Sequence, residues 1–183
     1  MNLKFDERKA TQLAGLLLTL RQQEGRMSYM KLIKLMYLID REALIQWGWS
    51  LTGDQYVSMK HGQVLSVTYD LVQDQVLGPK YWKTYISPPF GDKEVQLLKE
   101  PERNHLSKAE IELVMEVYKK FGHWSRWDLA DYTHGLPEYR ETKGPSLPVG
   151  YADVLLKAKH LSQEETEAVL EDHRALALLQ SLD

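Results

Sequence analysis

Apolar residues recur at intervals of three and four along much of the chain, which is the spacing that places side chains on one face of an α-helix. After Asp6, such a run predicts a helix over residues 7–23, followed by Gly25. A second run predicts a helix over 29–47, with Ser28 as its expected cap and Gly48 as its stop. This second helix is the expected centre of the core, because its inward face would carry Tyr29, Leu32, Ile33, Met36 and Ile39.

The period of the pattern changes in the middle of the chain. Turn residues surround a short predicted strand at 56–60, and a third helix is expected over 65–76, before Gly78 and Pro79. Two stretches rich in aromatic and branched residues then flank the turn sequence SPPFGD, so residues 81–98 predict a β-hairpin. Because two strands alone are marginally stable in water, we expect this hairpin to pair with the 56–60 strand or to pack on a helix.

The second half of the chain carries three capping boxes, in which a serine precedes an acidic residue by three positions. They begin at Ser107, Ser125 and Ser162, and they predict helices that run to Gly122, to Gly135 and through the last leucines of the chain. The remaining predicted elements are a Gly- and Pro-rich loop at 141–150 and a helix at 151–159.

Together these elements predict a mainly α, single-domain helical bundle of six or seven helices with a small antiparallel β-sheet or hairpin. The length of 183 residues, the apolar fraction of 43% and the charged fraction of 27% suit one globular domain over 1–183. The absence of cysteine excludes disulfides and cysteine nucleophiles. The longest apolar runs fall short of the ~20 residues that cross a bilayer, and no signal peptide is recognised, so we expect a cytoplasmic protein without membrane contact.

The charge of the chain bears on its partners. A formal net charge of -3 argues against a protein that mainly binds a nucleic-acid backbone. Lys31, Lys34 and Arg41 have the spacing of one helical face, which indicates either a solvated outer face or a narrow basic stripe that could touch phosphates. Nucleic acid is therefore not the expected partner, although a DNA-binding regulator stays open as an alternative.

The polar residues give few signs of catalysis. The six histidines form no HExxH motif, and no P-loop, GxGxxG or GxSxG sequence occurs. Asp128, Asp131 and His134 have the spacing of one helix face, which could hold a metal, position a proton or simply brace a short helix. A hydrolase or nuclease that uses His134 with Asp131, or His61 with Asp54, stays open as an alternative function. We expect no catalytic residue, no metal and no cofactor.

Aromatic residues gather instead near predicted helix ends and loops. Tryptophan and tyrosine dominate the energetic hot spots of protein interfaces, because they bring large rigid contact area. The irregular segment after the second helix therefore predicts a partner-binding rim on a rigid scaffold, formed by Trp47, Trp49, Tyr56, Lys60, His61 and Gln63.

Three stretches, MKLIKLMYLIDREAL, SLTGDQYVSMKHGQVLSVTYDLV and WSRWDLADYTHGLPEY, resemble the Panacea, or SocA-like, antitoxin domain over about residues 28–140. The resemblance implies an antitoxin that binds and neutralises a toxin encoded nearby, with relatives linked to prophages or to presentation of the toxin to a protease. The positions that match the family motif are Lys31, Leu32, Lys34, Leu35, Tyr37, Gly62, Val64, Tyr69, Ser125, Leu129, Thr133 and His134.

The chain also departs from the family pattern. The family usually has proline where Gln63 stands, a tryptophan near Met59, and Pro-Trp where this chain has Pro-Glu-Tyr around Glu138. Without the proline the turn is less rigid, but Gly62 still allows the tight bend. Loss of the aromatic contacts changes the expected specificity for a partner.

Overall fold

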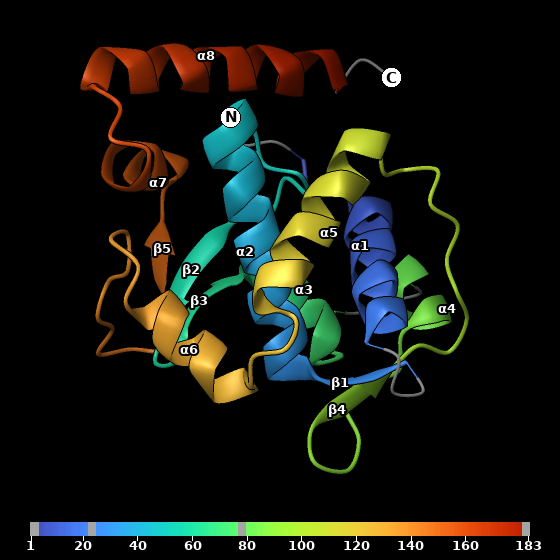
Figure 1. Ribbon diagram of the computed structural model, residues 1–183. Coiled ribbons are helices and arrows are strands. Elements are labelled where there is room, and N and C mark those ends of the chain that lie inside the picture. The colour runs from blue at the N-terminus through green and yellow to red at the C-terminus, as the bar shows by residue number, and fades with distance from the viewer. Residues whose placement is uncertain (1–3, 22–24, 77–79, 181–183) are drawn as a thin grey trace.

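The computed structural model describes residues 4–21, 25–76 and 80–180, and it has the predicted class: mainly α with a small amount of antiparallel sheet (Figure 1). Over these residues there are eight helices, where the sequence predicted six or seven. In chain order the elements are α1 (Glu7–Leu20), β1 (Arg26–Ser28), α2 (Tyr29–Trp47), β2 (Tyr56–Met59), β3 (Gly62–Leu65), α3 (Ser66–Val72), α4 (Tyr81–Tyr85), β4 (Glu94–Gln96), α5 (Lys108–Phe121), α6 (Arg126–His134), β5 (Leu147–Val149), α7 (Tyr151–Ala158) and α8 (Gln163–Gln180).

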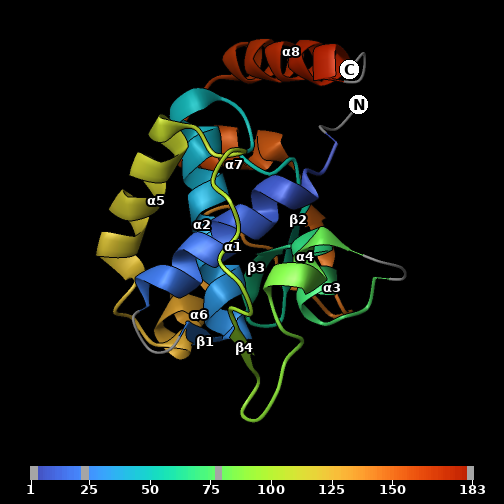
Figure 2. The same ribbon diagram turned by 90° about the vertical axis from the view of Figure 1, so that its right-hand side faces the viewer.

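Helix α2 is the centre of the core, as its apolar pattern predicts. It runs through the middle of the molecule in both views and packs against α1, α5, α6, α7 and β3 (Figures 1 and 2). It ends at Gly48, whose φ of 82° is left-handed. The expected side-chain cap at Ser28 is not formed; the first amide of the helix, on Tyr29, donates instead to the carbonyl of Lys93 at 3.0 Å.

Two small antiparallel sheets flank this helix. Strands β2 and β3 form a hairpin, and β5 pairs with the other edge of β2, giving the order β3-β2-β5. Strand β5 lies inside the segment predicted as a loop. Its Pro148 is tolerated because β5 is an edge strand, where a proline removes no ladder hydrogen bond. The second sheet pairs β1 with β4.

The hairpin predicted over 81–98 forms only in its inner part, where Ile86 bridges to Leu97 and Phe90 bridges to Glu94 in antiparallel fashion, and it does not pair with the Tyr56 strand. Residues 81–85 form helix α4 instead of a strand. Tyr81 and Tyr85 lie one helical turn apart, and the centroids of their rings are 4.7 Å from each other. The amide of Trp82 donates to the Glu7 carboxylate at 3.1 Å, which satisfies the start of this helix. Glu94–Gln96 is a strand as expected, but it pairs with β1 rather than with the Tyr56 strand.

The capping boxes define their helices as predicted. Ser107, Ser125 and Ser162 each accept from the amide three residues on, at 3.2, 3.1 and 3.1 Å. The third helix is shorter than expected and ends at Val72. The predicted ends of the first helix at 23 and of the last helix beyond 180 fall outside the described residues.

Helix α8 lies across the end of the molecule where α2 terminates (Figure 1). Its His173 is buried and accepts from the amide of Ser50 at 3.4 Å, and its ring lies 5.2 Å from that of Tyr151 on α7. Within the described residues, no helix has the length and apolar character that a membrane crossing needs.

Candidate functional site

The first two motif lysines of α2 point into the protein. Lys34 is 1% exposed, and its Nζ donates to the carbonyl of Gln63 on β3 at 2.8 Å. Nζ of Lys31 donates to the carbonyls of Gly122 and Trp124, at 2.6 and 2.7 Å, in the turn between α5 and α6. Both interpretations of Lys31, Lys34 and Arg41, a solvated outer face and a narrow basic stripe, are therefore wrong, because the three side chains link elements inside the protein.

Burial shifts the ionisation of both amines. It lowers the pKa of Lys34 to about 7, and burial together with the positive charge of Arg21 lowers the pKa of Lys31 to about 8. Both amines donate to main-chain carbonyl oxygens, which replace only part of the solvation that water gives to an ammonium group. Near neutral pH, Lys34 is therefore poised between its charged and neutral forms.

Gly62 and Gln63 join β3 to α6. Gly62 has a φ of +86°, and a Cβ added there would lie 2.2 Å from Oγ1 of Thr133 and 3.0 Å from the amide nitrogen of His134. The Gln63 side chain is fully buried. In the orientation that satisfies both ends of its amide, it donates to the carbonyl of Thr133 and accepts from the amide of Tyr139 at 3.1 Å. The residue that replaces the family's proline thus fastens β3 to the end of α6.

The second departure from the family pattern, Glu138, is also an internal residue. Its fully buried carboxylate accepts from Tyr37 at 2.9 Å and from Arg41 through Nε at 2.6 Å and through a terminal nitrogen at 3.2 Å. Burial and the nearby Glu138 charge raise the pKa of Tyr37. This charge-assisted fork ties the segment after α6 to α2, where an apolar contact would stand in the family pattern.

Two buried aspartates organise the start of the predicted binding segment. Asp40 accepts from the hydroxyl of Tyr56 at 2.7 Å and from the amide of Thr52 at 2.8 Å. Asp54 accepts from the amides of Val67 and Thr68, at 2.9 and 2.8 Å, at the start of α3. Burial raises the pKa of Asp54, against the lowering effect of these hydrogen bonds. Both carboxylates are therefore occupied by structural roles.

The six predicted partner-binding residues divide into three groups. Tyr56 and Gln63 are interior, as described. Lys60 and His61 are exposed and form the turn of the β2–β3 hairpin. Trp47 and Trp49 lie at the C-terminal end of α2, with ring centroids 6.1 Å apart, and Trp49 is 43% exposed.

The hairpin turn contacts an aromatic residue of α6. The ring of Trp127 is 53% exposed, and the ring of His61 lies 6.2 Å away in an edge arrangement. The guanidinium of Arg126 lies over the same Trp127 ring at 5.3 Å. We name Lys60, His61, Arg126 and Trp127 the hairpin surface. Beside it, Trp127 and Arg126 border a cavity of about 250 Å³ with Ser28, Tyr29, Met30, Asp92 and Lys93.

Trp49 borders a larger groove at the opposite end of α2. This groove has a volume of about 980 Å³. It is bordered by Lys4, Phe5, Asp6, Glu7, Arg8 and Lys9 before and in α1, by residues 49–53, and by Tyr81, His105 and Leu176. We name it the α8 groove, because Leu176 of α8 closes one side.

Asp128, Asp131 and His134 were the possible metal or acid-base face of α6. Asp128 completes the cap at Ser125, with its carboxylate accepting from the Ser125 amide at 2.9 Å. His134 is exposed and lies against the ring of Tyr139, with centroids 4.0 Å apart. Over residues 4–21, 25–76 and 80–180, no three His, Asp or Glu side chains converge in a way that could hold a metal ion.

Of the other motif residues, Val64 is buried and Tyr69 is half-buried.

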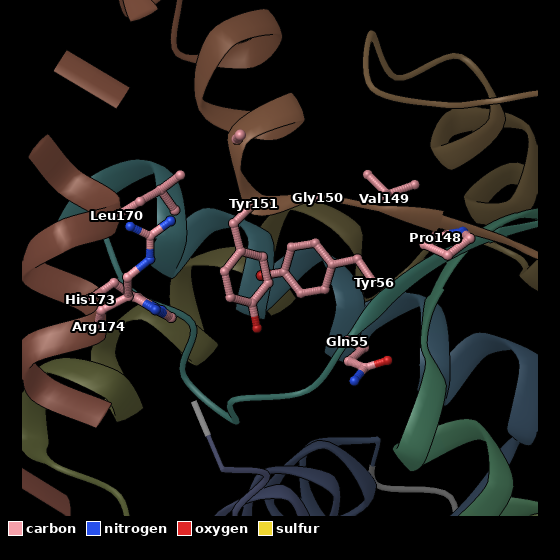
Figure 3. A pocket seen from close by; sticks show the side chains of 10 residues that line it. Gln55, Tyr56, Pro148, Val149, Gly150, Tyr151, Leu170, His173 and Arg174 are labelled. Atoms are coloured by element: carbon pink, nitrogen blue, oxygen red, sulfur yellow. The ribbon is translucent and has the colours of Figure 1, made fainter. Parts of the chain in front are cut away.

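A cavity of about 330 Å³ opens where β5 meets α7, and Figure 3 shows Tyr56 and Tyr151 side by side, facing His173 and Arg174 of α8. The hydroxyl of Tyr151 donates to the carbonyl of Asp54 at 2.5 Å. These contacts attach α7 and α8 to the body.

Two features escaped the sequence-based reasoning. The Arg41–Glu138 pair joins residues 97 positions apart, so no local pattern reveals it. Trp127 could have been found: Leu129, Ala130 and Thr133 are the inward positions of α6, which leaves Trp127, Asp131 and His134 on its outer face.

Comparison with known proteins gives one match. The family model described as "Antitoxin SocA-like, Panacea domain" matches residues 32–139. Neither curated proteins nor solved structures give a match. The matched segment runs from Leu32 in α2 to the residue after Glu138, so it contains the links of Lys34, Gln63 and Glu138 and the hairpin surface, whereas Lys31, α1, β5, α7 and α8 lie outside it.

Proposed function

This chain belongs to the SocA-like antitoxin family and carries its Panacea domain, and we propose that it neutralises a cognate toxin, encoded nearby, by direct protein–protein binding. The antitoxin-like character follows from the family. The proposal adds the mode of action, a complex between folded proteins, and the surface of this chain that makes it.

The observation that carries the proposal is the hairpin surface. Trp127 is half exposed yet held on both sides, by the His61 ring and by the Arg126 guanidinium, so binding a partner would cost little additional side-chain entropy. Tryptophan and arginine are the residues most enriched in interface hot spots. All four residues of this surface lie within the segment that matches the family.

The buried polar groups support binding rather than catalysis. Asp54, which could have served His61, has both carboxylate oxygens engaged at the start of α3. Lys31 and Lys34, which could have contacted DNA, are internal links. The surface that remains beside the hairpin presents the Trp127 ring with Lys60 and Arg126, and a terminal nitrogen of Arg126 also lies 3.7 Å from the Asp92 carboxylate. An exposed ring among these charges suits a protein partner with an apolar patch that carries acidic groups at its edge.

The proposal is tested by expressing the neighbouring gene with and without this protein, scoring growth, and measuring the affinity of the purified pair. Trp127→Ala should weaken binding at least tenfold, as loss of an aromatic hot spot does, and should leave the circular dichroism spectrum unchanged. Trp49→Ala is the matched control, since it removes a similarly exposed tryptophan at the other end of α2 and should change the affinity less than about threefold.

Each result decides the proposal. Full affinity in the Trp127→Ala protein would remove the hairpin surface from the interface. Rescue of growth without a complex between the purified proteins would refute neutralisation by direct binding. Disappearance of the toxin from rescued cells would point to presentation to a protease instead of a stable complex.

A further inference from the structure

Helix α8 carries exposed leucines that the antitoxin function does not use. Leu176 is 41% exposed and Leu179 is 64% exposed, and both lie in the C-terminal half of the helix. The inward stripe of the helix is formed by other residues, with Thr166, His173 and Ala177 buried. A helix with leucines outside its inward stripe presents a second apolar surface.

One of these leucines, Leu176, borders the α8 groove, and Leu179 follows it one helical turn on. Phe5 and Trp49 supply further apolar walls, from the segment before α1 and from the segment after α2. Figure 2 shows the C-terminal end of α8 on the same side of the molecule as the start of α1. The leucines and the groove therefore form one continuous surface.

The free charges at the groove are positive. Lys4 and Arg8 are exposed, with the Arg8 guanidinium 5.3 Å from the centre of the Tyr81 ring. Asp6 and Glu7 are half-buried and engaged, since Asp6 accepts from the amide of Lys9 and Glu7 accepts from the amide of Trp82. The groove thus presents two exposed cations at its border.

The first half of α8 has the opposite charge. It exposes four acidic side chains, at Glu164, Glu165, Glu167 and Glu171, and the exposed Asp172 follows just past the midpoint, ahead of the exposed leucines. The chain thus carries both members of a complementary pair: a helix with an acidic half and an apolar half, and an apolar groove with a cationic border.

We infer that two copies of this chain associate through α8 and the α8 groove, related by a two-fold axis. In an antiparallel arrangement the leucine halves of the two helices overlap, and the acidic half of each α8 continues past the end of the other toward Lys4 and Arg8. Such a contact is isologous, because each copy contributes the same surface.

The combined surface is needed for a stable dimer. Stable interfaces bury about 800 Å² on each copy. The outer face of one helix of this length, about 27 Å long and 10 Å wide, is too small alone. The groove beside it, with Phe5, Trp49 and Tyr81 along its walls, widens the contact.

The test is the molar mass of the purified full chain, measured by sedimentation at protein concentrations from about 1 to 100 μM. Leu179→Glu should convert the dimer to a monomer, because it puts a carboxylate into the overlap of the leucines. Leu98→Glu is the matched control, since Leu98 is similarly exposed, at 57%, and lies outside the groove. Arg8→Glu should raise the dissociation constant at least tenfold, by repulsion of the acidic half of α8.

A monomer at the highest concentration, or a dimer that survives Leu179→Glu, would overturn the inference. Dissociation by Leu98→Glu as well would also overturn it, because the contact would then lie elsewhere. If the chain is monomeric and Leu179→Glu instead abolishes binding of the toxin, the groove serves the toxin and not a second copy. Circular dichroism and the urea midpoint of each variant confirm that the fold is retained.

Discussion

Lys34 shows how a single buried side chain can set the response of the fold to pH. In the unfolded chain its amine titrates near the ordinary value of 10.5, whereas burial lowers the pKa to about 7 in the folded protein. Between these values the unfolded chain holds a proton that the folded protein has lost. Raising the pH across this window therefore favours folding, and below about 7 the folded protein carries a buried charge.

We predict that the free energy of unfolding rises from pH 7 to pH 9.5, with Lys34 contributing up to about 1.4 kcal/mol per pH unit. Lys34→Met should flatten this rise and should raise stability at pH 6, because a methionine needs no solvation there. Urea unfolding at a series of pH values measures both effects. Part of the slope should remain, since Lys31 has a pKa of about 8 and titrates in the same window.

The control for this prediction is Lys60→Met, which removes an exposed lysine from the hairpin turn and should leave the slope unchanged. Parallel curves for the wild-type and Lys34→Met proteins would show that Lys34 does not titrate in this range. Measurements above pH 10 are unsuitable, because the buried Tyr37 and Tyr56 have raised pKa values and reverse the sign of the dependence there.

Gly62 allows the close approach of β3 to α6. We predict that Gly62→Ala destabilises the protein by about 2 to 4 kcal/mol, from a left-handed backbone and from crowding against Thr133. Gly91→Ala isolates the backbone part, because Gly91 also has a positive φ but its added Cβ would meet no atom within 4 Å. It should cost about 1 kcal/mol in urea unfolding. Equal losses for the two variants would show that contact with Thr133 does not matter.

Single residues were the hardest level to predict from the sequence. The spacing of Lys31, Lys34 and Arg41 gives one helical face, but it does not say whether that face meets water or protein. Partners far away in the sequence decide this: the carbonyl of Gln63 for Lys34, and Glu138 for Arg41. The acceptor of the buried Lys34 amine is a main-chain carbonyl, so no acidic residue in the sequence indicates that this lysine is buried.

At the scale of elements, α2 carries the largest share of the core. Twelve of its residues are buried, and Leu35 is 0% exposed. We predict that Leu35→Ala lowers the free energy of unfolding by about 2 to 5 kcal/mol, through lost burial and the cavity left behind. Met115→Ala, on the exposed side of α5, should change it by less than about 0.5 kcal/mol. A loss below about 1 kcal/mol for Leu35→Ala would mean that the core repacks around the smaller side chain.

Elements defined by local chemistry were predicted well, and elements defined by distant partners were not. The capping boxes at Ser107, Ser125 and Ser162 are complete within four residues, so the sequence contains all the information needed. Helix α4 depends on Glu7 at its start, and β5 depends on pairing with β2. Neither partner is visible in the local pattern, and both segments were assigned to another class.

At the scale of the whole molecule, the predicted binding rim is two surfaces rather than one. Lys60 and His61 lie on the hairpin surface with Trp127, and the neighbouring cavity includes Tyr29 at the start of α2. Trp49 lies on the α8 groove, beyond the other end of the same helix. A helix of 19 residues is about 28 Å long, so the two surfaces are too far apart for one small contact to cover both.

This separation predicts that binding of the toxin and self-association are independent. Trp127→Ala should weaken the toxin complex and leave the dimer intact, and Leu179→Glu should give a monomer that binds toxin with unchanged affinity. Because distant sites without shared partners contribute additively, the double variant should show both losses at their single-variant size. Light scattering of the mixed proteins should give two antitoxins with two toxins for the wild type and one with one for Leu179→Glu. A toxin affinity that falls with Leu179→Glu while the dimer is lost would instead show that toxin binding requires both copies.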